Sequence, residues 1–416
     1  MTRRPLSPVA LAAAIAAGLG TAGGITTARA AQTPSGTVVT IRAARVFDGR
    51  GAVIPNGVVE VAGGRITAVG PREGAVTHDL GDVTLLPGLI DVHVHIDWHF
   101  QPNGLFGRRP GQPEETPAER DAAIRENLRA TLMAGFTTIQ TLGSRSDVAL
   151  RDAIAAGTIE GPRILTSAGQ LQARNRTPDE LREQVRAFKA AGADAIKTFA
   201  SGSIRTGGEM NVTQAQLDAI CDEARAQSLR SLVHAHDPAS IIAAAKAGCT
   251  QVEHGAFANA AAIQAMLDAG MYYDPNIGLV LQNYVENKDR FAGYGSYDEE
   301  GFAFMERAVP TLGPIFNQAL RAGVKMPLGT DAVAGAHGQN AREAIARVEA
   351  GGQSPPDALV SATSLAAESL GLGDRIGTLA PGYEADLVAV AGDPTTAIEA
   401  LRTVTFVMQR GRIVRQ

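Results

Sequence analysis

The chain has 416 residues, and its 38 basic and 43 acidic residues give a formal net charge of −5. Hydrophobic residues make up 45 % and charged residues 19 %, which excludes a disordered chain, a coiled coil and a collagen-like fibre. The acidic balance also argues against a general nucleic-acid binder, which needs a basic face to neutralise phosphates. Histidine and lysine are scarce, with 8 and 5 copies, so the position of each is informative.

Residues 1–30 have the features of a secretory signal peptide. A short basic start precedes an Ala-rich apolar run and then Ala28-Arg29-Ala30, which fits an A-x-A cleavage site. A membrane anchor is the alternative, but the apolar run is shorter than the ~20 residues of a span and contains glycines. Arg3-Arg4 also resembles a twin-arginine export signal. We expect cleavage near Ala30 and a secreted or periplasmic mature protein without membrane contact.

The chain has two cysteines, Cys221 and Cys249, in or beside Ala-rich stretches of helical composition. Free cysteine is among the most buried residue types, so two buried thiols are expected. A disulfide bond is the alternative.

The two ends of the chain have β composition, with β-branched residues alternating between Gly-containing turns. Between them, apolar runs of strand length alternate with Ala-rich helical stretches, which is typical of a parallel sheet with crossover helices. Strands are predicted at 88–95, 136–142, 163–168, 193–200, 230–236, 251–254, 271–277 and 325–331. Helices are predicted at 117–134, 147–155, 178–191, 213–228, 238–247, 259–269 and 303–322. Eight such repeats predict an α/β fold, a (β/α)8 TIM-like barrel with its active site at the carboxyl ends of the strands.

Metal-binding residue types stand at these carboxyl ends. The first strand ends in His93 and His95, whose i, i+2 spacing places both side chains on one face. The fifth, sixth and eighth strands end in further candidates, namely His234, His236, His254 and Asp331. Imidazole and carboxylate groups that converge from different strands predict a metal site.

Lys197 lies inside the otherwise apolar fourth strand. A buried lysine is costly unless it is paired or neutralised. An amine at the rim beside a carboxylate would explain it, and so would a Schiff-base lysine, although the latter leaves the histidines unexplained. We expect instead that the amine has reacted with CO2, because the carbamate is an anionic ligand whose two oxygens can bridge two metal ions.

Together these segments resemble the amidohydrolase superfamily over effectively the whole mature chain. The resemblance rests on LPGLIDVHVH, ADAIKTFASG, LVHAH, QVEHG, LGTDAVAGAHG and GTLAPGYEADLVAV. The chain looks most similar to the imidazolonepropionase-like branch, with its prolidases, Xaa-Arg/Lys carboxydipeptidases and ochratoxin-hydrolysing amidohydrolases. This implies a barrel over residues 87–375 and a small β-sandwich formed by residues 37–86 and 376–416.

The resemblance also implies two divalent metal ions, with zinc as the expected metal. It assigns His93, His95 and Asp331 to the more buried ion, His234 and His254 to the second, and carbamylated Lys197 with a hydroxide to the bridge between them. In such a two-metal hydrolysis the hydroxide attacks the scissile carbonyl. Asp331 then takes up the proton and delivers it to the leaving amine.

Substrate contacts are predicted around this centre. His236 faces inward, where relatives use Tyr or His to hold the substrate carboxylate or carbonyl. His337, in the loop after the eighth strand, is a second candidate, with loop packing as the alternative. Many relatives carry Gly-His-Gly after the third strand, whereas this segment has no histidine; Arg174 and Arg176 replace that contact or begin a solvated loop.

The segment 278–302 is longer than a typical βα loop, and five of the six tyrosines lie between 272 and 297. A long aromatic loop after a barrel strand predicts a lid that excludes water. A surface used for subunit packing is the alternative.

These features predict an enzyme, a metal-dependent amidohydrolase of dipeptidase or carboxypeptidase type. It should cleave dipeptides or N-acyl amino acids, including ochratoxin A-like amides, and release a C-terminal amino acid. A lactonase or phosphotriesterase on the same metal centre is the rival, and a non-catalytic barrel relative, which would usually lose ligands, is the third reading. Imidazolonepropionase itself is mononuclear and has no use for a strand lysine carbamate. Small amide substrates are the expected partners, and the relatives suggest a homo-oligomer.

Overall fold

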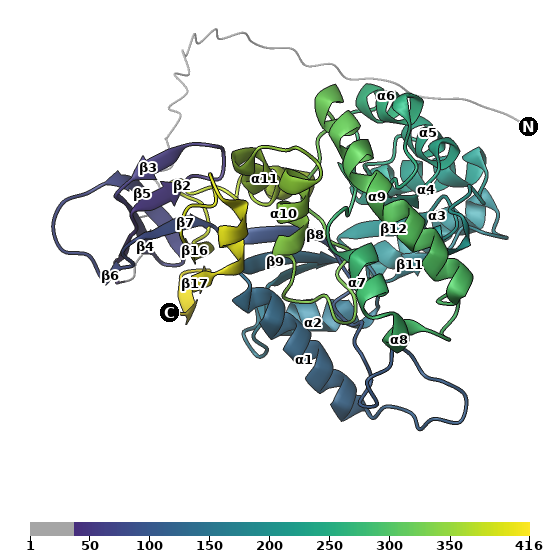
Figure 1. Ribbon diagram of the computed structural model, residues 1–416, viewed down its shortest axis with the longest axis horizontal. Coiled ribbons are helices and arrows are strands. Elements are labelled where there is room, and N and C mark those ends of the chain that lie inside the picture. Colours follow the sequence, from purple (N-terminus) through teal and green to yellow (C-terminus); the bar gives the residue numbers. More distant parts are fainter. Residues whose placement is uncertain (1–36) are drawn as a thin grey trace, which may run out of the picture. The chain divides into compact units, whose positions relative to one another are not determined.

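The computed structural model describes residues 37–416, so the predicted signal peptide lies outside the described part of the chain (Figure 1). Within this range, none of the helices combines the length and the apolar composition that a bilayer span requires.

Strands from both ends of the chain share one sheet, in which the last strands lie beside the first (Figure 1). Its order is β18 (Arg412–Arg415), β17 (Val404–Gln409), β16 (Leu387–Ala391), β7 (Val83–Pro87), β2 (Arg45–Phe47) and β3 (Val53–Pro55). A second sheet has the order β5 (Arg65–Pro71), β4 (Gly57–Ala62), β1 (Val39–Arg42) and β6 (His78–Asp79). Ile41 and Val59 of the second sheet belong to the same buried hydrophobic cluster as Leu85 and Phe406 of the first.

The middle of the chain follows the predicted alternation of parallel strands and helices. One sheet contains β8 (Leu89–Val94), β9 (Phe136–Thr141) and β10 (Arg163–Thr166). Another contains β11 (Gln170–Leu171), β12 (Ala195–Phe199), β13 (Arg230–Ala235), β14 (Gln251–His254) and β15 (Tyr272–Asp274). The intervening helices are α1 (Pro117–Met133), α2 (Ser146–Ala155), α3 (Pro178–Ala190), α4 (Gln214–Ala226), α5 (Pro238–Lys246) and α6 (Ala260–Asp268). The predicted strands and helices up to residue 277 are therefore present, and only the two-residue β11 was not anticipated.

Three of these helices begin with the same local device. Thr116, Thr177 and Thr213 each accept a hydrogen bond from a backbone N–H of the first turn, and the side chain three residues later bonds back to the threonine backbone. Such a capping box satisfies two otherwise free donors and sets the starting residue of the helix.

The eighth predicted strand is wrong as a continuous strand. Residues 325–331 make parallel bridges only at Lys325 and, just beyond, at Ala332. Backbone hydrogen bonds nevertheless reach both neighbouring strands, since the Lys325 carbonyl accepts from β15 and the Asp331 N–H donates to β8. Pro327 has no N–H to donate, and Asp331 has a left-handed φ of 51°, so a regular ladder cannot run through the segment.

The segment 278–302, expected as a long loop, is mostly helical. It contains α7 (Val280–Glu286) and α8 (Lys288–Phe291), and α9 (Glu299–Ala322) begins before its predicted start. Asp298 explains that early start, because its side chain accepts from the Gly301 N–H and caps the helix. The chain continues through α10 (Ala341–Glu349), α11 (Pro355–Ser361) and α12 (Ser364–Ser369), with short 3-10 turns at η1 (Ile204–Thr206) and η2 (Ile398–Arg402).

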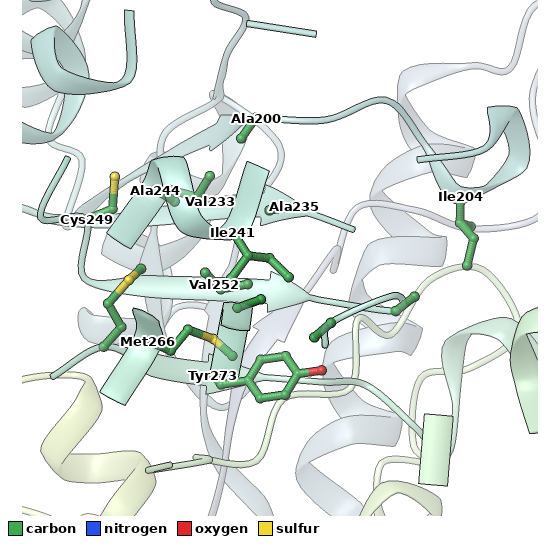
Figure 2. Packing of buried hydrophobic residues seen from close by; sticks show 14 of the residues in the cluster. Ala200, Ile204, Val233, Ala235, Ile241, Ala244, Cys249, Val252, Met266 and Tyr273 are labelled. Carbon is green, nitrogen blue, oxygen red and sulfur yellow. The ribbon is translucent and has the colours of Figure 1, made fainter. Parts of the chain in front are cut away.

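The expectation of two buried thiols is wrong, because Cys221 and Cys249 form a disulfide bond. Cys221 lies on α4, and Cys249 lies in the turn before β14. Both belong to the largest apolar cluster, of which Figure 2 labels Cys249, Met266 and the β14 residue Val252 among other members. Only the packing of α4 against the following βα unit brings together two residues that are 28 positions apart in the sequence.

Candidate metal centre and substrate cavity

The carboxyl ends of the parallel strands bring the six predicted metal ligands to one cavity. His93 lies on β8 and His95 just after it, Lys197 lies on β12, His234 on β13 and His254 on β14. Asp331 comes from residues 325–331, which form backbone hydrogen bonds with both β15 and β8. Most of these side chains are buried; Lys197 is only 2 % exposed. These burial values place the set at the carboxyl ends of the packed parallel strands and not on the protein surface.

One group is formed by His93, His95 and Asp331, whose candidate ligand atoms all lie within 4.8 Å of one another. Asp331 Oδ1 is 3.2 Å from His95 Nε2 and 3.4 Å from His93 Nε2. Lys197 Nζ is 3.4 Å from the same His93 Nε2. The i, i+2 histidine spacing thus produces the shared face that was predicted.

His234 and His254 lie beside this group. Their ring centroids are 4.6 Å apart, and the His254 ring is 5.3 Å from that of His93. His254 Nδ1 is 4.0 Å from the second carboxylate oxygen of Asp331. Asp331 therefore faces both groups of histidines, one with each oxygen.

Backbone strain is concentrated at two of these residues. His254 has a φ of 70° and Asp331 a φ of 51°, which for residues other than glycine lie in the left-handed region. Such conformations cost of order 1–3 kcal/mol each and persist where the surrounding structure imposes them, often at functional sites.

The electrostatics suit a cation. Burial lowers the pKa of His93 and takes those of His234 and His254 well below the usual value, so these imidazoles are neutral and keep a lone pair. Burial also lowers the pKa of Lys197, towards the uncharged amine that can react with CO2. Burial alone would raise the pKa of Asp331, but its close contact with His93 and the hydrogen bond from His95 hold it below its usual range. Neutral imidazoles, an ionised carboxylate and a deprotonatable lysine form a donor set that fits divalent metal ions.

Two carboxylates that the sequence analysis missed lie beneath His93. Glu253 Oε2 and Asp274 Oδ2 are 2.9 and 3.0 Å from His93 Nδ1. Burial raises the pKa of both carboxyl groups, to about 7 for Asp274. Asp274 Oδ2 accepts the Nδ1 proton, which orients the ring and leaves Nε2 free for a metal. The available signal was an acidic residue inside each of two otherwise apolar strands, QVEH and MYYD.

Replacing Asp274 with asparagine is expected to weaken metal binding about 10- to 100-fold, the usual effect of losing a carboxylate behind a ligating histidine. Competition with a chelator of known affinity measures the change. Asp268→Asn, on the exposed end of α6, is the matched control and should bind metal as the wild type does. Equal metal affinity of the Asp274 variant and the control would contradict the orienting role.

Arg347 supplies the positive charge behind these carboxylates. It is fully buried and lies 3.7 Å from Asp274 and 3.0 Å from Glu343. Its two Nη atoms donate to the carbonyls of Met326 and Pro327, at 2.8 and 2.9 Å, in the segment that leads to Asp331. Arg347 therefore holds both Asp274, which contacts His93, and the backbone segment that leads to Asp331.

The candidate metal ligands line a cavity of about 430 Å³. Its wall also contains His236, Trp98, Arg174 and Arg205 together with apolar side chains. The α7 helix contributes Val280, Leu281 and Tyr284, so the segment expected as a lid forms part of the wall as a helix.

Of the predicted substrate contacts, the structure brings His236 and Arg174 to this cavity but not His337 or Arg176. His337 Nε2 is 3.0 Å from the Trp98 carbonyl oxygen, and the residue faces a separate hollow beside Met133 and Arg415. Loop packing, the alternative role for His337, matches this position. Arg176 turns to the side-chain amide of Gln184 on α3.

Comparisons with known proteins agree with this geometry. The Amidohydrolase family model matches residues 84–414. Ochratoxinase from Aspergillus niger is 26 % identical over 92 % of this chain and 88 % of its own length. Imidazolonepropionase from Deinococcus deserti is also 26 % identical, over 83 % of this chain and 86 % of its own.

Among solved structures, a Xaa-Pro dipeptidase with bound methionine in the active site superposes with a TM-score of 0.81. It is 27 % identical and covers 91 % of this chain and 100 % of its own. A prolidase complexed with N-methylphosphonate-L-proline gives a TM-score of 0.80 at 26 % identity, with the same coverage. Such neighbours have a TIM-barrel-like α/β fold. The chain therefore belongs to the amidohydrolase family and is a hydrolase that acts on C–N bonds.

Proposed function

We propose that the protein is a binuclear metal-dependent amide hydrolase that cleaves dipeptides or N-acyl amino acids and releases a C-terminal amino acid. The observation that carries the proposal is the convergence of His93, His95, Lys197, His234, His254 and Asp331 at one end of a cavity of about 430 Å³. Pockets of about 300–1,000 Å³ suit small-molecule substrates. The ligands named for the two structural neighbours, an amino acid (methionine) and a phosphonate derivative of proline, support the same substrate class.

We infer that the predicted domains correspond to a closed barrel and a sandwich. The parallel sheets are linked at β10, where the Asp194 N–H donates to the Thr166 carbonyl at 2.8 Å, and residues 325–331 bond to both β15 and β8. These links support closure of eight segments over residues 87–375. The hydrophobic cluster shared by the two terminal sheets supports a sandwich of residues 37–86 and 376–416.

In this proposal His93, His95 and Asp331 would hold one divalent ion, zinc by expectation, and His234 and His254 would hold the second. Lys197, whose Nζ is 3.4 Å from His93 Nε2, would add an anionic ligand as its carbamate. When bound, the ions polarise the scissile carbonyl and lower the pKa of water. Amidohydrolases are generally metal-dependent, and the group formed by His93, His95 and Asp331 in the described residues is consistent with this.

Asp331 is the proton carrier. It is the only carboxylate among the residues that line the cavity, and its lowered pKa keeps it ionised and able to accept a proton at neutral pH. Its position between both histidine groups lets it take a proton from the attacking water and deliver it to the leaving amine.

His236 is a neutral hydrogen-bond donor for the substrate carbonyl in this proposal. Its side chain lines the cavity and stacks on His254 with ring centroids 5.1 Å apart. Its Nδ1 is buried and has no hydrogen-bond partner within residues 37–416. Burial lowers the pKa of His236 to about 3, so the ring is uncharged and acts through hydrogen bonds, not through a positive charge.

We also propose that the mature enzyme works outside the cytoplasm. The Cys221–Cys249 disulfide supports this, because such bonds persist in oxidising compartments such as the periplasm and the extracellular space. Cell fractionation of the native host tests the location, and size-exclusion chromatography tests the proposed homo-oligomer.

Zinc-loaded enzyme is expected to hydrolyse members of a panel of dipeptides and N-acyl amino acids that includes ochratoxin A. Removal of metal with a chelator should abolish the activity, and added zinc should restore it, because the histidine cluster alone lacks a Lewis acid. Hydrolysis of lactones or phosphotriesters, with inactivity on every amide, would contradict the proposal and favour an esterase on the same centre.

A further inference from the structure

Arg205 places a positive charge at the cavity wall without a carboxylate partner. The residue belongs to η1, which directly follows β12 and its Lys197. Its Nε donates to Ser296 Oγ at 3.0 Å. Neither Nη atom makes a hydrogen bond or an ion pair with any residue between 37 and 416. A guanidinium has five N–H donors, which normally find acceptors when the group is partly enclosed. The Nη donors of Arg205 are therefore available to bind an acceptor on a ligand.

Two buried tyrosines hold the guanidinium in place. Its carbon lies 4.0 Å from the ring centroid of Tyr297 and 5.7 Å from that of Tyr284. The tyrosine rings are 3 % and 4 % exposed, so they form a rigid support. Stacking on a ring face leaves the in-plane edge of the fork available, which is the edge that binds a carboxylate with two parallel hydrogen bonds.

The charges of the cavity favour an anionic ligand. Apart from Asp331 at the metal end, no residue lining this cavity carries a carboxylate, whereas Arg174 and Arg205 are both cationic. The lining of the cavity also contains apolar side chains, among them Ile204, Val212, Val280, Leu281 and Leu312. A substrate with a basic side chain would find no carboxylate to pair with at this wall. A substrate with an apolar side chain and a carboxylate would match both the apolar residues and the arginine.

We propose that Arg205 binds the free α-carboxylate of the C-terminal amino acid of the substrate, and that the site selects anionic substrates with an apolar side chain at that position. This inference rests on the proposed amide hydrolysis and names its substrate class and specificity residue. The carboxylate anchor and the metal-binding residues lie in the walls of one cavity, so a bound substrate spans from Arg205 to the catalytic end.

The test compares N-acetyl-L-phenylalanine with its carboxamide, N-acetyl-L-phenylalaninamide, by measuring the release of acetate. The wild-type enzyme is expected to prefer the carboxylate substrate by about 10- to 100-fold in kcat/KM, the effect of one hydrogen-bonded charge pair. Arg205→Met should lose this preference through a raised KM for the carboxylate substrate, while the carboxamide is hydrolysed as before. Arg205→Lys keeps the positive charge but cannot form two parallel hydrogen bonds with a carboxylate. Its preference for the carboxylate substrate should lie between those of the wild type and Arg205→Met.

Arg182→Met, on the exposed surface of α3, is the matched control and should keep the wild-type preference. Metal content and thermal unfolding of every variant identify a loss of structure. An equal decrease on both substrates in Arg205→Met would show a merely structural role and overturn the inference. Equal hydrolysis of both substrates by the wild type would also overturn it while leaving amide hydrolysis intact. Activity on neither substrate nor on any other amide would instead contradict the proposed function.

Discussion

Replacing Lys197 with alanine is expected to lower kcat/KM by at least ~100-fold. Losing a residue that only orients a metal ligand costs up to ~100-fold, and losing a ligand itself should cost at least as much. Lys197 is buried beside His93 Nε2, and its carbamate would supply the anionic link between the two histidine groups. Without it, the neutral imidazoles and the single carboxylate of Asp331 must hold both ions, so metal content should fall together with activity. Steady-state kinetics and elemental analysis of the same preparation measure the two effects.

Lys189→Ala is the matched control, since this lysine is exposed on α3, and it should keep wild-type kinetics and metal content. The carbamate has its own readout. Wild-type enzyme equilibrated with 13C-labelled bicarbonate should show a carbamate carbon resonance that Lys197→Ala lacks. An active Lys197→Ala enzyme with its full metal content would contradict the ligand role, and an active wild type without the resonance would contradict the carbamate.

Replacing Arg347 with methionine is expected to cost about 3–5 kcal/mol of unfolding free energy, as when one partner of a buried ion pair is removed. Asp274 and Glu343 would both lose their buried counter-charge, and the carbonyls of Met326 and Pro327 would lose their donors. Methionine retains much of the apolar volume, so the loss reports the polar contacts more than a cavity. Urea unfolding followed by tryptophan fluorescence and circular dichroism measures the change.

The control is Arg342→Met on the same helix, which removes a partly exposed pair with Glu286. Exposed ion pairs contribute about 0–1 kcal/mol, so this variant should unfold close to the wild type. Similar midpoints for the two variants would show that the Arg347 network does not stabilise the fold.

Local rules predicted that the candidate residues would meet at one edge, and the resemblance to the amidohydrolase superfamily selected the six predicted ligands among them. His93 and His95 show the i, i+2 spacing of one strand face, and His254 and Asp331 end apolar runs of strand length. In a parallel α/β fold such ends meet on one side of the sheet, so counting strands was sufficient to place the residues together. The irregular path of residues 325–331 did not disturb this, since backbone bonds to both neighbours still position Asp331.

The supporting residues could not be predicted in the same way. Glu253 immediately precedes a predicted ligand and Asp274 lies in an apolar run, so neither stands out without the fold. In the sequence, nothing distinguishes Arg347 and Arg205 from other arginines of helices and loops. Only the tertiary packing buries Arg347 and places Arg205 at the cavity wall. The disulfide bond could not be predicted either, because no local sequence pattern distinguishes two buried thiols from a disulfide.

The sequence by itself determined the alternation of strands and helices, the residue types at the strand ends and hence the class of chemistry, because these depend on periodicity and on short-range spacing. Tertiary structure alone decided which polar groups face each other across the sheet: the carboxylates behind His93, the buried charge of Arg347, the disulfide, and the separation of His337 from the cavity. Those contacts join residues far apart in the chain, and they depend on the register and tilt of packed elements, which are set by the whole core and not by any one segment.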